Sequence, residues 1–161
     1  SETTAAAAGA VGVVRRDPMA MLPFAGYNMG DYFTHWLDMG KKIKNPPKIF
    51  NVNWFRTDDD GNFIWPGFGE NMRVLMWILD RCEGKAEAVK SPIGYLPKPK
   101  DISVEDLDSV TTDTIRELLS VDKELWTEDA ENVRKFYTGI GERVPSEFYT
   151  ELDALEARLA K

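Results

Sequence analysis

The sequence contains almost no cysteine or histidine. Cys82 and His35 are the only residues of their types among 161. A single cysteine cannot form an internal disulfide, and one histidine beside it does not supply the ligand set of a zinc site. A metal bound by this sequence would need carboxylates, or ligands from elsewhere. The sequence therefore predicts neither a disulfide scaffold nor a zinc centre.

Positive charge is also in short supply. Twenty lysines and arginines stand against 27 acidic residues, which gives a formal net charge of −7. An acidic chain without a basic run suits neither a phosphate backbone nor an anionic membrane. No segment approaches the roughly 20 apolar residues of a membrane span, and the opening SETTAAAAG lacks the basic flank and apolar stretch of a signal peptide. We expect no nucleic-acid partner, no membrane association and a cytoplasmic setting.

Motifs that hold phosphate or calcium are missing as well. GFGENM begins like a dinucleotide fingerprint, but Met72 stands where the third glycine belongs, and G-x-x-x-x-G-K-[ST] does not occur. In DDDGNF, Phe63 takes the place of the glycine that a calcium loop requires, so this segment is interpreted as a turn. His35 has no nucleophile at a recognisable spacing and is interpreted as a packed core residue. Nothing here predicts catalysis by this chain alone.

The composition that remains, with 43% hydrophobic and 29% charged residues, is that of one globular unit, and the strands and helices predicted below make its class mixed α+β. Alternation in KIFNVNWF predicts a half-buried strand, TDDDGN a turn and FIW a returning strand, which together form a β-hairpin. Short strands are also expected at 11–15 and within SPIGYLPKPKD. Apolar periodicity predicts helices, with Ser146 as the N-cap of the last one, over residues 30–43, 70–83, 112–119, 122–138 and 147–160.

Five aromatic side chains fall within residues 53–71, and they divide into two groups. We interpret the tryptophans of this region, with Trp77, as core residues. The phenylalanines are placed differently: Phe55 on the polar strand face, Phe63 beside the turn, and Phe68 between two glycines that allow close backbone approach. A planar base inserted between such rings gains roughly 1–3 kcal/mol per stacking contact.

Asn71 lies three and four residues before Val74 and Leu75, so its carboxamide is expected on the inward side of the first helical turn. An amide offers both a donor and an acceptor, and this one is suited to contact the edge of a base. The alternative is a non-catalytic interaction module whose exposed aromatics bind a protein or peptide. That module predicts no dependence on nucleotide.

NWFRTDDDGNFIWPGFGEN followed by MRVLMWILDR, together with SETTAAAAG and DPMAMLPFAGYNMGDYFTHWL, resembles the carboxyl-terminal portion of GTP-dependent phosphoenolpyruvate carboxykinase. The resemblance covers nearly the whole chain and weakens after about residue 110. It implies an enzyme of gluconeogenesis that converts oxaloacetate and GTP into phosphoenolpyruvate, GDP and carbon dioxide. It also implies a guanine-binding site formed by Phe55, Phe63, Phe68, Gly69, Glu70 and Asn71.

The resemblance implies that residues 1–161 are the C-terminal portion of the nucleotide-binding domain. This portion comprises a mobile lid loop at 2–12, a guanine-binding hairpin and helix at 48–84, and a helical tail at 104–161. Small side chains that bury little agree with a lid, because its closed state must be only slightly favoured. Where vertebrate members carry bulkier polar residues, this sequence has Ala8, Gly9 and Ala10, so polar contacts of those lids are not carried over. The lid residues are Glu2, Thr3, Thr4, Ala5, Ala6, Ala7, Ala8, Gly9, Ala10, Val11 and Gly12.

The family's phosphate-binding loop and its catalytic metal ligands have no match here and are expected upstream. The chain thus resembles a fragment that is inactive alone and works with the upstream N-terminal part of the same enzyme. Mn²⁺ and Mg²⁺ are implied for the full-length enzyme, with no ligands in this chain, and the full-length enzyme is implied to be a monomer.

Overall fold

The computed structural model describes residues 16–161, and the chain divides into two compact units, so the prediction of one globular unit was wrong. Unit 1 consists of Ser1–Pro46 and Lys123–Lys161, and unit 2 consists of Pro47–Asp122. The predicted strand at 11–15 and the predicted lid at 2–12 lie outside the described residues. In the part of the chain that is described, no helix combines the length and apolar character needed to cross a membrane.

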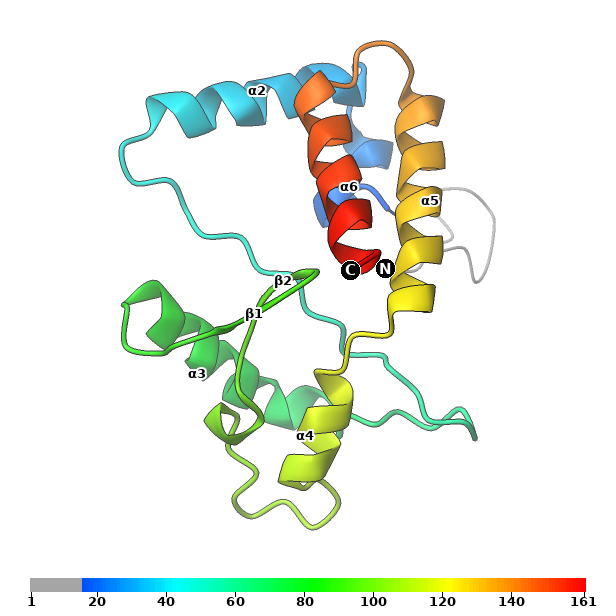
Figure 1. Cartoon of the computed structure of the whole chain (residues 1–161). Coiled ribbons are helices and arrows are strands. Elements are labelled where there is room, and N and C mark those ends of the chain that lie inside the picture. Colours follow the sequence, from blue (N-terminus) through cyan, green and yellow to red (C-terminus); the bar gives the residue numbers. More distant parts are fainter. Residues whose placement is uncertain (1–15) are drawn as a thin grey trace. The chain divides into compact units, whose positions relative to one another are not determined.

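Unit 1 is helical in its described part. It contains two 3₁₀ turns, η1 (Pro18–Ala20) and η2 (Leu22–Phe24), and three helices: α2 (Met29–Lys42), α5 (Lys123–Ile140) and α6 (Ser146–Leu159). Helices α5 and α6 run antiparallel, side by side (Figure 1). Arg134 of α5 joins them, because its guanidinium bonds to Asp153 at 2.6 Å and to Glu156 at 2.8 Å. These bonds raise the pKa of Arg134, so the cation stays charged.

Helix α2 begins at a side-chain cap. The Asn28 carboxamide oxygen accepts from the Gly30 N–H at 2.8 Å, while its amide group donates to the Ile140 carbonyl at 3.2 Å. Phe33 is fully buried and its ring stacks on Phe148 with centroids 4.6 Å apart. The start of α2 is therefore held both to α6 and to the end of α5.

The periodicity of the sequence predicted the helices correctly, with two local corrections. His35 is exposed and stacks on Tyr32, so its interpretation as a core residue was wrong. Two residues along a helix correspond to a rotation of about 200°, which places His35 opposite the buried Phe33. Pro145 precedes α6 as its cap residue, and Ser146 is the first helical residue and not the N-cap.

Unit 2 contains α3 (Asn71–Cys82), α4 (Thr112–Leu118), the 3₁₀ turns η3 (Phe68–Glu70) and η4 (Pro99–Asp101), and an antiparallel pair of strands, β1 (Val89–Ser91) and β2 (Gly94–Leu96). The strands pair in the register Val89 to Leu96 and Ser91 to Gly94. The core of unit 2 is formed by Trp65, Trp77, Ile102, Val110 and Ile115, and the half-buried Trp54 packs against it. All three tryptophans therefore contribute to the core, as the sequence predicted.

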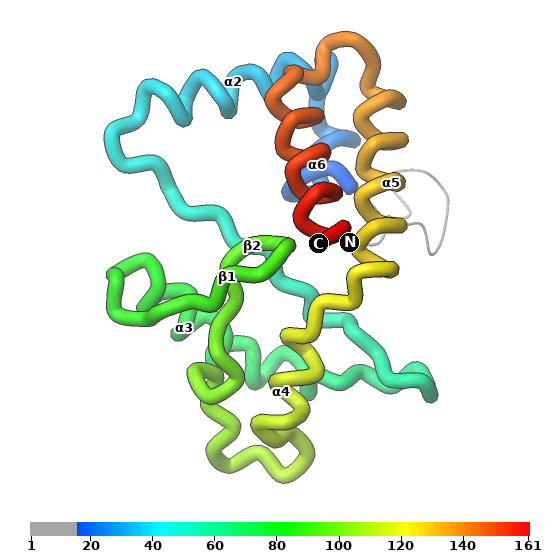
Figure 2. Tube along the Cα trace, viewed as in Figure 1, coloured from blue at the N-terminus to red at the C-terminus, as the bar shows by residue number. Residues whose placement is uncertain are grey.

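The hairpin predicted at 48–65 does not form regular strands. Thr57 and Phe63 make one isolated antiparallel bridge, and residues 47–66 otherwise follow an extended, irregular path in the Cα trace of Figure 2. A two-stranded ribbon is only marginally stable without a third strand or a packed helix. The alternation persists only in part: Phe50 and Trp54 pack against the core and Phe55 is exposed, but Val52, which alternation puts on the same face as Phe50 and Trp54, is exposed too.

The described residues thus have a mixed α/β architecture with several helices and one two-stranded antiparallel sheet, placed at 89–96 and not at 48–65. This fold class fits the mixed fold expected from the sequence.

Candidate functional site

Three exposed phenylalanines mark the candidate site in unit 2. The side chains of Phe55, Phe63 and Phe68 are 67%, 64% and 94% exposed. The rings of Phe55 and Phe63 meet edge to face with centroids 5.9 Å apart, as expected if the chain turns back between them. Exposing three large rings is unfavourable unless something covers them. In the described residues Phe68 makes no ring contact with the other two.

A turn ordered by Asp58 brings the first two rings together. One oxygen of its carboxylate accepts from the N–H groups of Asp60 at 3.0 Å and Asn62 at 2.8 Å. The Asn62 N–H is the main reason why the pKa of Asp58 lies below its ordinary value. The predicted turn chemistry of TDDDGN is therefore present, with Gly61 at a positive φ of 82°.

Arg56 anchors this segment to α4. Its guanidinium donates to the carbonyls of Glu117 at 2.7 Å and Leu118 at 3.2 Å, and to the Ser120 hydroxyl at 3.0 Å. The last carbonyls of a helix carry partial negative charge, so a cation there is favourable. Since neighbouring side chains of an extended segment point to opposite sides, fixing Arg56 also directs Phe55 outward.

The bend before α3 depends on Gly67. Its φ of 106° and ψ of −157° fall in a region that is essentially accessible only to glycine. Phe68 follows directly in η3, and its carbonyl accepts from the Asn71 N–H. Gly69, by contrast, has no positive φ, and a Cβ there would meet no atom within 4 Å. The open space over Gly69 leaves room for a ligand beside Phe68.

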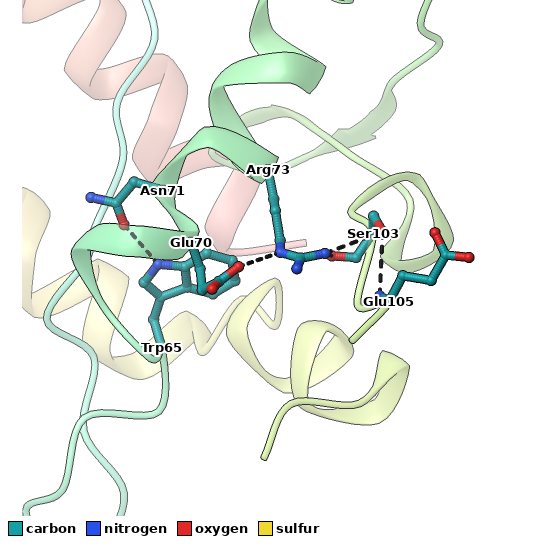
Figure 3. Close-up of polar contacts among 6 residues, drawn as sticks. All are labelled: Trp65, Glu70, Asn71, Arg73, Ser103 and Glu105. Carbon is teal, nitrogen blue, oxygen red and sulfur yellow. Dashed lines mark hydrogen bonds and ion pairs between the residues drawn. The ribbon is translucent and has the colours of Figure 1, made fainter. Parts of the chain in front are cut away.

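Asn71 is half-buried at the start of α3, and Trp65 fixes its orientation. The Trp65 indole Nε1 donates to the Asn71 Oδ1 at 2.8 Å, while the amide nitrogen points away from the indole (Figure 3). None of the described residues accepts a hydrogen bond from that nitrogen. This agrees with the expected inward position of Asn71 and shows which of its two polar atoms is used by the protein.

Glu70, which the resemblance also places in the site, turns toward Arg73. Its carboxylate bonds to the Arg73 Nε at 2.5 Å, and the same guanidinium donates to the Ser103 carbonyl at 3.2 Å (Figure 3). The Glu70 carboxylate therefore fixes the junction of η3 and α3 against the Ser103 loop. If Glu70 lies beside a base, it does so through its backbone, because its carboxylate is already bonded to Arg73.

The site is an open surface. Hollows of about 480 and 370 Å³ lie elsewhere: the first is lined by Glu131, Arg134, Lys135 and Thr138 and the second by Trp77 with charged residues. Within residues 16–161, no three His, Cys, Asp or Glu side chains gather where they could hold a metal ion. At this surface the described residues present three aromatic rings and the amide group of Asn71.

Sequence reasoning missed the groups that support the site. Arg56 and Arg73 reach partners 30 or more residues away in the sequence. Trp65 and Asn71 are six residues apart, a spacing that belongs to no regular helical or strand contact. A tryptophan predicted as core still needs a hydrogen-bond partner for its N–H, and that requirement was the one available signal.

Comparison with known proteins places these features in a family. A family profile described as the phosphoenolpyruvate carboxykinase C-terminal P-loop domain matches residues 1–158. A phosphoenolpyruvate carboxykinase [GTP] from Paenarthrobacter aurescens is 51% identical over 162 residues, and one from Renibacterium salmoninarum is 50% identical over 161 residues. A third, from Treponema pallidum, is 49% identical over 163 residues. Each match covers 99% of this chain but 26% of the relative.

The match first defines the class: the chain corresponds to part of a P-loop domain. More particularly, it belongs to the GTP-dependent phosphoenolpyruvate carboxykinase family, and it spans about a quarter of the length of the relatives it matches.

Proposed function

We propose that this chain supplies the base-binding surface of a GTP-dependent phosphoenolpyruvate carboxykinase. Phe55, Phe63 and Phe68 hold the purine by stacking, Gly69 and Glu70 shape the backbone beside it, and Asn71 contacts its edge. The observation that supports this proposal is that three exposed phenylalanines and a half-buried asparagine with an available amide group belong to the same compact unit. Family membership supports guanine as the base.

The whole enzyme would convert oxaloacetate and GTP into phosphoenolpyruvate, GDP and carbon dioxide in the cytoplasm. Mn²⁺ and Mg²⁺ would be held elsewhere, because the described residues contain no cluster suited to them. Residues 2–12 would close over the active site as a lid. Phosphoryl transfer depends on metal and phosphate clamps, so the 161-residue chain alone would be inactive, and turnover by the purified chain would contradict this.

The test separates stacking from edge contact in the complete enzyme. Phe68→Ala should raise the KM for GTP and ITP together with little change in selectivity, because stacking accepts any purine face. Asn71→Ala should remove a hydrogen bond worth roughly 0.5–1.5 kcal/mol, up to about tenfold, and should narrow the gap between GTP and ATP. The measurement is the GTP/ATP ratio of kcat/KM for each variant.

Tyr95→Ala is the matched control, since Tyr95 is 64% exposed in the same unit and outside the proposed site. It should leave the kinetic constants unchanged. If Asn71→Ala leaves the GTP/ATP ratio of kcat/KM unchanged while Phe68→Ala brings it close to one, the assignment of stacking to Phe68 and of edge contact to Asn71 is wrong. The competing interaction module predicts no binding of GDP, so a change in tryptophan fluorescence when GDP is added to the complete enzyme discriminates between the two functions.

A further inference from the structure

The strongest unassigned feature is the bond from the buried indole of Trp65 to Asn71. Trp65 is 5% exposed and is packed in the core of unit 2, so its ring has little freedom to turn. Its Nε1 lies 2.8 Å from the Asn71 Oδ1 (Figure 3). A group that is fixed in the core therefore touches the one polar side chain proposed to contact the base.

An indole N–H only donates hydrogen bonds, whereas a carboxamide donates through its nitrogen and accepts through its oxygen. The two ends of an asparagine have nearly the same shape, so the side chain alone does not determine which end faces a ligand. Beside Trp65 only one orientation makes a hydrogen bond. The flipped amide would place two donors together and leave the buried indole N–H unsatisfied, which is costly.

We propose that Trp65 is a positioning residue that makes Asn71 a hydrogen-bond donor toward the base and thereby selects 6-oxo purines over 6-amino purines. This inference rests on the proposed base-binding function and deepens it. The 6-position of guanine or hypoxanthine carries an oxygen that accepts from the Asn71 amide group. Adenine carries an amino group there, and two donors would face each other.

The position of Asn71 in the chain supports this role. It is the first residue of α3, and its own N–H is held by the Phe68 carbonyl, so both its backbone and its Oδ1 are fixed by the protein. The amide nitrogen is the one side-chain atom that the described residues leave available. A preorganised donor needs no rearrangement when a base binds, and this preserves the discrimination between bases.

The first test compares Trp65→Phe with Trp54→Phe in the complete enzyme. Both variants exchange an indole for a phenyl ring in the same core, and the two tryptophan rings lie 6.3 Å apart, but only Trp65 bonds to Asn71. Trp65→Phe should lower the ratio of kcat/KM for GTP over ATP by about tenfold, mainly through KM. ITP should behave as GTP does, because it keeps the 6-oxygen. Trp54→Phe should leave the ratio unchanged.

The second test does not depend on the core remaining intact. Asn71→Asp keeps an oxygen for the Trp65 N–H but replaces the amide donor by an acceptor. Asn71→Asp should lower kcat/KM for GTP more than Asn71→Ala does. Its kcat/KM for ATP should be higher than that of Asn71→Ala. Circular dichroism melting of each variant verifies folding, and this test decides the matter if Trp65→Phe does not fold.

The outcomes separate this inference from the function on which it rests. Relaxed selectivity in Asn71→Ala together with equal ratios in Trp65→Phe and Trp54→Phe would overturn the positioning role and leave the base-binding function standing. The positioning role would also be overturned if Asn71→Asp and Asn71→Ala had the same kcat/KM for GTP and the same kcat/KM for ATP. An unmodified enzyme that does not distinguish GTP from ATP would overturn both the proposed function and the positioning role.

Discussion

At the scale of single residues, Asp58 determines how two of the site's rings meet. Its carboxylate accepts the N–H of Asn62, which lies beside Phe63, while Asp58 itself follows the bridging Thr57. The Asn62 N–H is also the main cause of the lowered pKa of Asp58, because a hydrogen bond to a carboxylate favours its charged form. Proton binding to Asp58 and the geometry of the turn are therefore linked.

We predict that the turn loosens only in acid. The pKa of Asp58 is lower in the folded chain than in the unfolded chain, so its contribution is complete above the unfolded value and is lost as the pH falls through the folded one. The amide-proton shift of Asn62, followed by NMR, should stay constant near neutral pH and change below about pH 4.

Asp58→Asn should displace the same NMR signal at every pH. Asp59→Asn is the matched control, because the Asp59 carboxylate takes no part in the bonds of this turn, and it should leave the signal unchanged. The role given to Asp58 would be contradicted if both substitutions shifted the Asn62 signal equally, or if that signal did not change as the pH is lowered.

Some residue positions were predictable and others were not. The exposure of the phenylalanines and the burial of the tryptophans followed from alternation and glycine placement, which are local properties. The contact between Trp65 and Asn71 did not, because it depends on the bend at Gly67. The prediction for His35 was wrong because it rested on the usual fate of a lone histidine on a helix and not on the position of His35 relative to the buried residues Met29, Gly30 and Phe33.

At the scale of elements, α2 shows how a helix start depends on a close backbone approach. A Cβ at Gly30 would lie 2.4 Å from the Arg143 carbonyl oxygen, which is far inside van der Waals contact. At Gly40, in the same helix, a Cβ would meet nothing within 4 Å. A close backbone approach therefore requires a glycine at position 30 but not at position 40.

We predict that Gly30→Ala destabilises the chain by about 1–3 kcal/mol, because the backbone at Arg143 must move to accommodate the methyl group. Gly40→Ala should instead stabilise it by up to about 1 kcal/mol, because alanine favours a helix interior more than glycine does. Urea unfolding followed by circular dichroism measures both changes. A loss of stability in Gly40→Ala equal to that in Gly30→Ala would show that the close approach at Arg143 does not matter.

Elements were predictable where their signals were local. The helices followed from apolar periodicity and from breakers such as the Gly84 that follows α3, which has a φ of 76°. The strands at 48–65 failed because pairing needs a partner, and a sequence with the right alternation does not show whether the partner lies close enough. The brief strand expected in SPIGYLPKPKD is β2, and its partner β1, which begins before that segment, was not predicted; a short turn between Ser91 and Gly94 joins the two strands.

At the scale of the whole molecule, α3 exposes more apolar surface than is usual for a helix that faces solvent. Met72, Leu75, Met76 and Leu79 lie at helical spacing and are 39–54% exposed. The relatives that the chain matches are about four times as long as the matched part, and the proposed function belongs to an enzyme of that length. We expect the remaining part of the enzyme to cover this face.

The corresponding prediction compares Met76→Glu in two settings. In the complete enzyme it should lower the free energy of unfolding by about 2 kcal/mol or more, because a charge replaces a buried methionine. In the 161-residue chain the same change should be tolerated, since Met76 is 51% exposed there, and it should reduce binding of an apolar dye. Met76→Leu is the control and should affect neither. Equal stability loss in both settings would show that α3 is not covered.

The connectivity of unit 2 is that of a segment inserted into another unit. It is continuous in sequence, Pro47–Asp122, while unit 1 is split around it. Arg56, in the first part of unit 2, bonds to Glu117, Leu118 and Ser120 near its end, so an early and a late segment of the unit are joined. Segments whose ends lie close can be inserted into another chain with little disturbance. Unit 2, continuous in sequence and joined between its first part and its end by Arg56, has the connectivity that such an insertion requires.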